Sequence, residues 1–349
     1  MNTTPEREIW ADNIRLIATI GVILLHVSST GLYEFRKTSA FDWMTANLVD
    51  SITRCCVPLF FMLSGALLLS KTENAFNFYR KRFSRVIIPF LFWSLIFNVA
   101  FTMLQYLKGH PISISVFFTD LLFYQGIFSQ QAYHLWYIYV ILGLYILTPL
   151  IKSFLKTKLN IYIFMGAWII SIILCLPEFQ FNNATTYLLK FVCYTGYFGL
   201  GHIISQKKII LQKKHKITLL LIAISLILFT ALGTLTLSNQ SNTFNDILYD
   251  YYSPNIILFS VIMFLLIKTC KKDFVRSNKI LNKINHQSYG IYLSHVLFLS
   301  VFERVGFDWN FIHPLIAIPL VSTTTLSMSL ILISTLSLHP TIRKLSTGH

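Results

Sequence analysis

Charged residues are scarce in this sequence, and acidic ones are the scarcest. Of the 349 residues only 12% are charged, with 14 Asp and Glu against 29 Lys and Arg, whereas 54% are hydrophobic. A soluble domain carries about 25% charged residues, so this composition excludes an ordinary soluble protein. The long apolar runs instead predict an integral membrane protein that crosses the bilayer several times.

Cysteines with the spacing of metal ligands are lacking as well. The chain has five cysteines, all in or beside apolar runs: Cys55, Cys56, Cys175, Cys193 and Cys270. None of them forms the closely spaced pairs of a structural zinc site, and their positions do not suggest a disulfide framework. We therefore expect no metal site and interpret the cysteines as small packing residues.

Ten runs are long enough to span a bilayer, which takes about 20 mainly apolar residues. They lie at residues 10–32, 46–70, 86–106, 134–151, 160–177, 187–204, 217–237, 254–269, 286–304 and 313–337. The sequence thus predicts an all-α, polytopic transmembrane helical bundle of about ten spans, with residues 1–349 forming a single integral membrane domain and no separate soluble domain. A further apolar segment, 112–128, contains Asp120, and we expect it to be interfacial or re-entrant.

The basic residues predict the orientation in the membrane, because short cytoplasmic loops collect Lys and Arg. With the N-terminus inside, 22 basic residues fall in inner segments and only 5 in outer ones. Both termini are therefore expected in the cytoplasm. The net charge of +15 is accordingly a topology signal, and it does not indicate a nucleic-acid partner.

The first predicted span carries two ionisable residues within "IRLIATIGVILLHVSS", residues 14–29. Arg15 and His26 are eleven residues apart, close to three full helical turns, so both project from one face about 16 Å apart along the axis. Asp12, three residues before Arg15, can pair with it. Arg15 alone can be a topology anchor and His26 alone a helix-to-helix hydrogen bond, but their shared face favours a functional polar stripe.

The second predicted span contains a buried cation in "RCCVPLFFMLSG", residues 54–65. Pro58 cannot donate a backbone hydrogen bond to the Arg54 carbonyl, so we expect a kink there. Ser64 and Gly65 are small enough to allow close approach of another helix. Ordinary helix packing explains the small residues better than it explains Arg54.

A basic cluster follows in "FYRKRFSRVIIPF", residues 78–90, with Arg80, Arg82 and Arg85. An inner loop would collect these residues in any case. Arginine forks also suit phosphates, so the cluster is a candidate docking site for a soluble phosphorylated donor.

Two later segments contain further histidines. His134, in "YHLWYIY", opens a span from the outside and is expected at the outer interface, where an aromatic belt explains the neighbouring rings. In "SYGIYLSHVLF", residues 288–298, Ser288, Tyr292 and His295 are spaced by four and three, which places them on one helix face. A hydrogen bond between helices is the alternative reading of His295.

These motifs together resemble the acyltransferase-3 family of bacterial membrane proteins, which O-acylate surface sugars. The resemblance is carried, in order, by "DNIRLIATIGVILLH", "VPLFFMLSG", "RKRFSRVIIP", "HLWYIYVILGLYILTPLI" and "SYGIYLSH". It is closest to the branch that O-acetylates polysaccharides such as enterobacterial common antigen. Leu16 and Ala66 stand where the family commonly has Gly and Tyr.

The resemblance implies an enzyme of the bacterial cytoplasmic (inner) membrane. Acetyl-CoA or another acyl-CoA would bind from the cytoplasm through Arg80, Arg82, Arg85 and Arg15. The acyl group would pass to a hydroxyl of a surface glycan or its lipid-linked precursor. His26 would act as a general base or a transient acyl carrier.

The remaining roles follow the same resemblance. Arg54 would stabilise the oxyanion, and His134 would orient or deprotonate the acceptor. The lipid bilayer and these two substrates are the expected partners, with no metal and no nucleic acid.

An exporter or flippase of a polysaccharide is the alternative function. Ten spans with a polar path suit a transporter. Ion-coupled transport, however, needs carboxylates inside the membrane, and we place Asp12 and Glu303 at span ends. The sequence therefore favours the enzyme.

Overall fold

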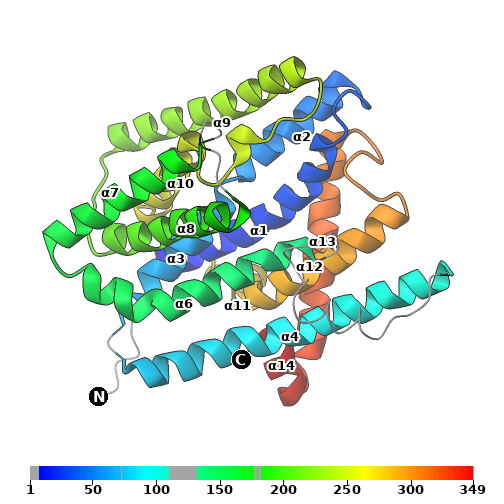
Figure 1. Ribbon diagram of the computed structural model, residues 1–349. Helices are drawn as coiled ribbons and strands as arrows, with labels where there is room; N and C mark the ends of the chain where they lie inside the picture. The colour runs from blue at the N-terminus through cyan, green and yellow to red at the C-terminus, as the bar shows by residue number, and fades with distance from the viewer. Residues whose placement is uncertain (1–7, 72, 110–131, 177–178, 180–181, 349) are drawn as a thin grey trace. The chain divides into compact units, whose positions relative to one another are not determined.

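The computed structural model describes residues 8–71, 73–109, 132–176, 179 and 182–348, and in these ranges the chain is helical without strands (Figure 1). The helices are α1 (Ile9–Leu32), α2 (Ala40–Thr53), α3 (Cys56–Leu68), α4 (Ala75–Leu107), α6 (Trp136–Phe154), α7 (Lys158–Leu174), α8 (Asn183–Ser205), α9 (Lys213–Ser241), α10 (Pro254–Lys268), α11 (Lys279–His286), α12 (Ser288–Arg304), α13 (Pro314–Leu336) and α14 (Pro340–Thr347), with short 3-10 turns η2 (Tyr133–Leu135) and η3 (Ile247–Tyr249).

Helices occupy all ten predicted spans. Within the described residues, seven helical segments are long and apolar enough to cross a membrane: α1, α2 with α3, α4, η2 with α6, α9, η3 with α10, and α13. Helix α7 is apolar but shorter, and α8 and α12 cover the other two predicted spans. The all-α polytopic fold is confirmed, whereas the segment 112–128 lies outside the described residues.

The chain divides into two compact units. Unit 1 comprises 1–71, 148–285 and 308–322, and unit 2 comprises 72–147, 286–307 and 323–349. Helices α6 and α13 contribute residues to both units. Both units contain residues that the sequence predicts to be functional.

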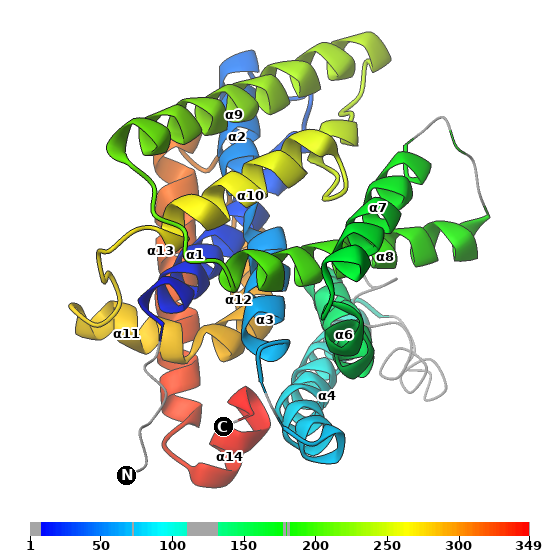
Figure 2. The same ribbon diagram turned by 90° about the vertical axis from the view of Figure 1, so that its left-hand side faces the viewer.

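Unit 1 is built around α1, which packs against α2, α3 and α10. Helix α3 also packs against α8, α8 against α7, and α9 against both α2 and α10, as Figure 2 shows for α2, α9 and α10. Most residues of α1 are buried, and they include the apolar Ile14, Ala18 and Ile23. Burial on several sides agrees with the central place of α1 in unit 1.

Unit 2 is built around α4, which packs against α12 and α14. In Figure 1 α4 is the long cyan helix, with the red α14 beside it. The indole of Trp93 on α4 donates to the Ser346 carbonyl at 3.1 Å, and the Tyr289 hydroxyl on α12 donates to the Val86 carbonyl at 2.9 Å. Polar side chains therefore fasten both neighbours to α4.

The predicted kink at Arg54 is confirmed as a break between two helices. Helix α2 ends at Thr53 and α3 begins at Cys56. Pro58 has no N–H to donate to the Arg54 carbonyl, so the helical hydrogen-bond ladder is interrupted there. The single predicted span 46–70 is consequently a pair of shorter helices that begins earlier, at Ala40.

Helix α4 extends about three turns beyond the N-terminal end of the predicted third span, 86–106. Helix α4 begins at Ala75, so the basic cluster lies on a helix and not in a loop before it. The side chain of Asn74 accepts a hydrogen bond from the Phe76 N–H at 2.9 Å and caps the first turn. Hydropathy alone cannot detect a helix that continues into its polar flank.

Helices α3 and α8 approach each other at glycine. A Cβ built on Gly65 would lie 1.7 Å from the Phe198 carbonyl oxygen, and one built on Gly201 would lie 2.0 Å from the Met62 carbonyl oxygen. Only a residue without a side chain fits there. The expectation that the Ser64–Gly65 pair allows close packing is confirmed for Gly65.

Candidate active site

The N-terminal part of α1 carries a buried ion pair. Nη1 of Arg15 donates to Oδ1 of Asp12 at 3.1 Å, and the Asp12 side chain is only 2% exposed. Asn285 donates to the same carboxylate oxygen at 3.1 Å. The predicted Asp12–Arg15 pair is confirmed, and Asn285 is a partner from a distant part of the chain.

His26 lies near the other end of α1 and is half-buried. Its helical neighbours Leu25 and Val27 are buried, whereas Arg15, eleven residues earlier, is also half-buried. This pattern agrees with the predicted shared face. Eleven residues of helix separate the two side chains by about 16 Å, so they do not meet.

Arg54 is held by several groups at the break between α2 and α3. Its Nη1 lies 3.3 Å from Oδ2 of Asp50, and its Nε donates to the Tyr249 carbonyl at 2.8 Å. The guanidinium carbon also lies 4.9 Å from the centre of the Tyr249 ring and 5.1 Å from that of Tyr251. The cation is thus neutralised by an acid and covered by aromatic faces.

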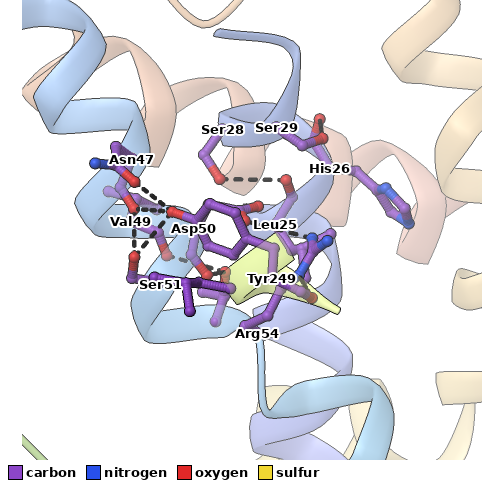
Figure 3. A network of polar contacts seen from close by, with 12 residues as sticks. Leu25, His26, Ser28, Ser29, Asn47, Val49, Asp50, Ser51, Arg54 and Tyr249 are labelled. Carbon is purple, nitrogen blue, oxygen red and sulfur yellow. Dashed lines mark hydrogen bonds and ion pairs between the residues drawn. The ribbon is translucent and has the colours of Figure 1, made fainter. Parts of the chain in front are cut away.

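A polar network holds Tyr249 beside Arg54 (Figure 3). The Tyr249 hydroxyl contacts the Asn47 side chain, donates to the Asn47 carbonyl at 2.8 Å and lies 2.9 Å from the Ser51 hydroxyl. Asn47 donates to the Ala231 carbonyl of α9 at 2.8 Å. The network joins α2, α9 and η3. In Figure 3 the His26 ring projects from α1 in a direction away from Asn47.

The sequence analysis did not consider Asp50, which lies within the predicted span 46–70. Asp50 belongs to α2, and its side chain has no exposed surface. Asp12 lies in the first turn of α1, in agreement with its predicted place at a span end, and its side chain is buried. The signal was present, since Asp50 precedes Arg54 by four residues and such pairs meet on a helix.

Unit 2 brings together His134, Tyr292 and His295. The His134 and His295 rings are 5.1 Å apart, and the Tyr292 ring lies 5.6 Å from His134 and 5.9 Å from His295. The Tyr292 hydroxyl donates to the His134 carbonyl, and His134 Nε2 lies 3.3 Å from the Leu293 carbonyl oxygen. The predicted common face of Tyr292 and His295 is confirmed.

His134 is buried among side chains of unit 2. Its side chain is 1% exposed, and that of His295 is completely buried. The Phe97 ring of α4 lies 5.4 Å from the His134 ring. The burial of His134 results from contacts with α4 and α12, which are distant in the sequence.

The basic cluster on α4 is divided between exposed and engaged arginines. Arg80 and Arg85 are exposed, whereas Nη2 of Arg82 donates to Oε1 of Glu73 at 3.2 Å. Nζ of Lys81 lies 3.5 Å from the other oxygen of Glu73. Partial burial opposes ionisation of Glu73, but the hydrogen bonds and charges of Arg82 and Lys81 outweigh it and hold the pKa of Glu73 below its ordinary value.

One predicted residue, Ser64, belongs to none of the groups described above. Ser64 is half-buried on α3, next to the glycine that contacts α8. Among the residues that the structure describes, no group of three or more His, Cys, Asp or Glu side chains is placed to hold a metal ion. The candidate residues thus form separate groups: an Arg54 network and a half-buried His26 within unit 1, and, within unit 2, a buried histidine pair and an arginine cluster.

Comparison with known proteins identifies the family. Residues 8–336 match the family model Acyl_transf_3, described as an acyltransferase domain. The chain belongs to the acyltransferase-3 family. It is therefore an enzyme that transfers acyl groups, and its apolar helices make it a multi-pass membrane acyltransferase.

The match places the motifs in one domain model. All five motifs that carry the resemblance fall within residues 8–336. The first lies on α1 and the last at the start of α12. No curated protein and no solved structure matches this acyltransferase. Its donor, its acceptor and the branch of the family are therefore matters of proposal.

Proposed function

We propose that this acyltransferase moves an acetyl group from cytoplasmic acetyl-CoA to a hydroxyl of a surface polysaccharide or its lipid-linked precursor, in the inner membrane of a bacterium. The observation that carries the proposal is a half-buried histidine, His26, in the unit that also holds Arg54. The motifs favour the branch that modifies polysaccharides such as enterobacterial common antigen. The alternative is an exporter that moves the glycan without modifying it.

The donor would bind at the arginine cluster. Coenzyme A carries phosphates, and arginine forks bind phosphate oxygens with paired hydrogen bonds. Arg80 and Arg85 are exposed on α4, whereas Arg82 already donates to Glu73. Arg80 and Arg85 are accordingly the primary phosphate contacts in this proposal, and Arg82 supports them when it exchanges Glu73 for the ligand.

Arg15 is assigned a lesser part in donor binding. Its guanidinium is half-buried and paired with Asp12, so a phosphate would have to compete with a buried carboxylate. The same pair also fastens α1 to Asn285. Loss of Arg15 is therefore expected to affect folding as well as the affinity for the donor.

His26 would carry out the proton transfer. A neutral imidazole accepts the proton of the acceptor hydroxyl, whose oxygen attacks the thioester carbonyl, and the thiol of coenzyme A leaves with a proton returned by the imidazolium. A covalent acyl-His intermediate is the second route to the same products. Both routes need an imidazole that substrate can reach, which agrees with the partial exposure of His26.

Arg54 would stabilise the oxyanion that forms during the attack. A guanidinium has five N–H donors; the Nε of Arg54 donates to the Tyr249 carbonyl, and Asp50 forms an ion pair with Nη1. Removing one such donor from an oxyanion hole typically lowers kcat by about 10²–10³. Because Asp50 and Tyr249 hold the guanidinium in place, it does not have to move when the oxyanion forms.

His134 is the third proposed catalytic residue. It would orient or deprotonate the acceptor, with Tyr292 and His295 holding its ring. Its burial means that access to it depends on the neighbouring aromatic side chains. His134→Gln should therefore lower transfer less than His26→Ala does.

The test is mass spectrometry of surface glycans from cells that express the wild type, the His26→Ala variant or no protein, at matched membrane levels. His215→Ala, an exposed histidine of unit 1, is the control variant. Acetylated glycan with the wild type and the control, and none with His26→Ala, would support the proposal. Equal acetylation by His26→Ala would remove its catalytic role, and unmodified glycan whose surface amount follows the protein would favour the exporter.

A further inference from the structure

We infer that the segment Tyr249–Tyr252, which we call the tyrosine loop, forms with Lys190 and Arg54 a binding site for an uncharged sugar ring of the acceptor. The inference rests on the proposed function, because it names the acceptor site of that reaction. The tyrosine loop joins η3 to α10, and all these residues belong to unit 1.

Side chains from three helices hold the tyrosine loop in one conformation. The Tyr249 hydroxyl is bound by Asn47 and Ser51 of α2. Tyr197 of α8 donates to the Tyr251 carbonyl at 2.5 Å, and Asn255 of α10 donates to the Leu248 carbonyl at 2.8 Å. A loop fixed in this way loses little entropy when a ligand binds, which is the advantage of a preorganised site.

The last two tyrosines of the loop remain accessible and face cations. Tyr251 and Tyr252 are half-buried, in contrast to the fully buried Tyr249. The Arg54 guanidinium lies 5.1 Å from the Tyr251 ring centre, and Nζ of Lys190 lies 5.5 Å from that of Tyr252. Asp250 interacts with the Tyr252 hydroxyl. The cluster therefore combines aromatic faces with hydrogen-bonding groups.

The charges of the cluster balance. Arg54 is paired with Asp50, and Lys190 and Asp250 supply one further charge of each sign. Such a site exerts no net electrostatic attraction on an ionic ligand. The Arg54 guanidinium, the Lys190 ammonium and the Asp250 carboxylate can nevertheless all form hydrogen bonds with hydroxyl groups. A neutral pyranose has the matching chemistry, with an apolar C–H face for the rings and hydroxyls around its edge.

The position of the cluster agrees with a role in acceptor binding. Arg54 is shared between the cluster and the proposed oxyanion site, so a sugar held by Tyr251 would have its hydroxyls near the same guanidinium. In the predicted orientation the tyrosine loop lies on the outer side, where a surface glycan is assembled. Tyrosines of a lipid-facing interfacial belt are the competing explanation, which the following experiment tests.

The experiment measures steady-state transfer by purified protein in lipid nanodiscs. The acceptor is the cell's own surface glycan, stripped of O-acetyl groups with mild alkali, and the donor is acetyl-CoA. Tyr252→Ala and Lys190→Met should each raise the KM for glycan roughly three- to tenfold, the effect of losing one aromatic contact or one hydrogen bond. In both variants the KM for acetyl-CoA and kcat should stay unchanged.

Tyr187→Ala is the matched control, since Tyr187 is 58% exposed on α8, the same helix that carries Lys190. An unchanged glycan KM in Tyr252→Ala and Lys190→Met, with active wild type, would overturn the inference and leave the proposed function intact. A second measurement, equilibrium dialysis of fluorescently labelled glycan, does not depend on transfer. Binding lost only in the two variants would support the site even if the wild type transfers nothing, whereas equal binding by all proteins or none by the wild type would overturn it.

Discussion

Asp50 and Arg54 are bound to each other one turn apart, with Oδ2 of Asp50 lying 3.3 Å from Nη1 of Arg54 and no surface of the Asp50 side chain exposed. Arg54 in turn donates to the carbonyl of Tyr249, 195 residues further along the chain. The pair thus connects a break in a membrane helix to the tyrosine loop. A local contact and a distant one together set the position of the guanidinium.

Removing the charge of Asp50 should destabilise the protein strongly. Asp50→Asn leaves Arg54 without its countercharge in a buried site, and breaking such a pair costs about 3–5 kcal/mol. Glu34→Gln is the control, because Glu34 and Lys37 form an exposed pair of similar spacing, 3.4 Å apart, and such pairs are worth about 0–1 kcal/mol. Thermal unfolding in detergent measures both. Equal midpoints for the two variants would contradict the stabilising role of the Asp50–Arg54 pair.

The glycine contact between α3 and α8 should tolerate no side chain. Gly65→Ala would place a methyl group 1.7 Å from the Phe198 carbonyl oxygen, and overpacking of this kind costs about 1–3 kcal/mol or more. Gly166→Ala is the matched control, since nothing lies within 4 Å of its added Cβ. Unfolding temperature and membrane yield should fall for Gly65→Ala alone. Similar values for both variants would show that the helices do not approach as closely as described.

Donor binding should depend most on the exposed arginines of α4. Arg80→Ala and Arg85→Ala are each expected to raise the KM for acetyl-CoA roughly tenfold, the loss of one charge-assisted contact of about 1.5 kcal/mol. Lys156→Ala, an exposed basic residue elsewhere, should leave it unchanged. Increasing salt should weaken binding by the wild type more than by the variants. KM values equal to that of the wild type in both variants would show that the phosphates of acetyl-CoA bind outside this cluster.

Glu73 should make unit 2 sensitive to acid. Its pKa is held below the ordinary 4.5, so its ion pairs with Arg82 and Lys81 stabilise the folded protein fully above pH 4.5 and are lost as the pH falls through the lower folded pKa. Wild type should therefore lose more stability below pH 4.5 than Glu73→Gln does, and the difference should be small because Lys81 is 60% exposed. Unfolding temperatures from pH 7 to pH 3 measure this, and parallel curves would contradict it.

Helices α7 and α8 should be open to cross-linking through two native thiols. The sulfurs of Cys175 and Cys193 lie 3.7 Å apart, so a small rotation brings them to bonding distance. Copper phenanthroline with dissolved oxygen should oxidise this pair, and thiol labelling of the unfolded protein should then drop by two. Cys193→Ser should abolish the cross-linked peptide in mass spectrometry. A cross-link that involves Cys270 instead would contradict this packing.

Hydropathy and local spacing predicted much of this protein. Ten apolar runs, the Asp12–Arg15 pair, the break before Pro58 and the small residue at Gly65 each depend on residues within one helix or one turn. Such features are decided by hydrogen bonding and side-chain spacing along the chain itself. The start of α4 at Ala75 was missed because a polar helix has no hydropathy signal.

The sequence by itself determined that this protein is a membrane bundle of helices and, through its motifs, an acyltransferase. Only the tertiary structure decided that Tyr249 holds Arg54 and that His134 is buried against Tyr292 and His295. These contacts join residues more than 150 positions apart, as in the His134 contact to Leu293 across 159 residues. Local propensity carries no information about such pairs, because they form only when the packing of distant helices places them together.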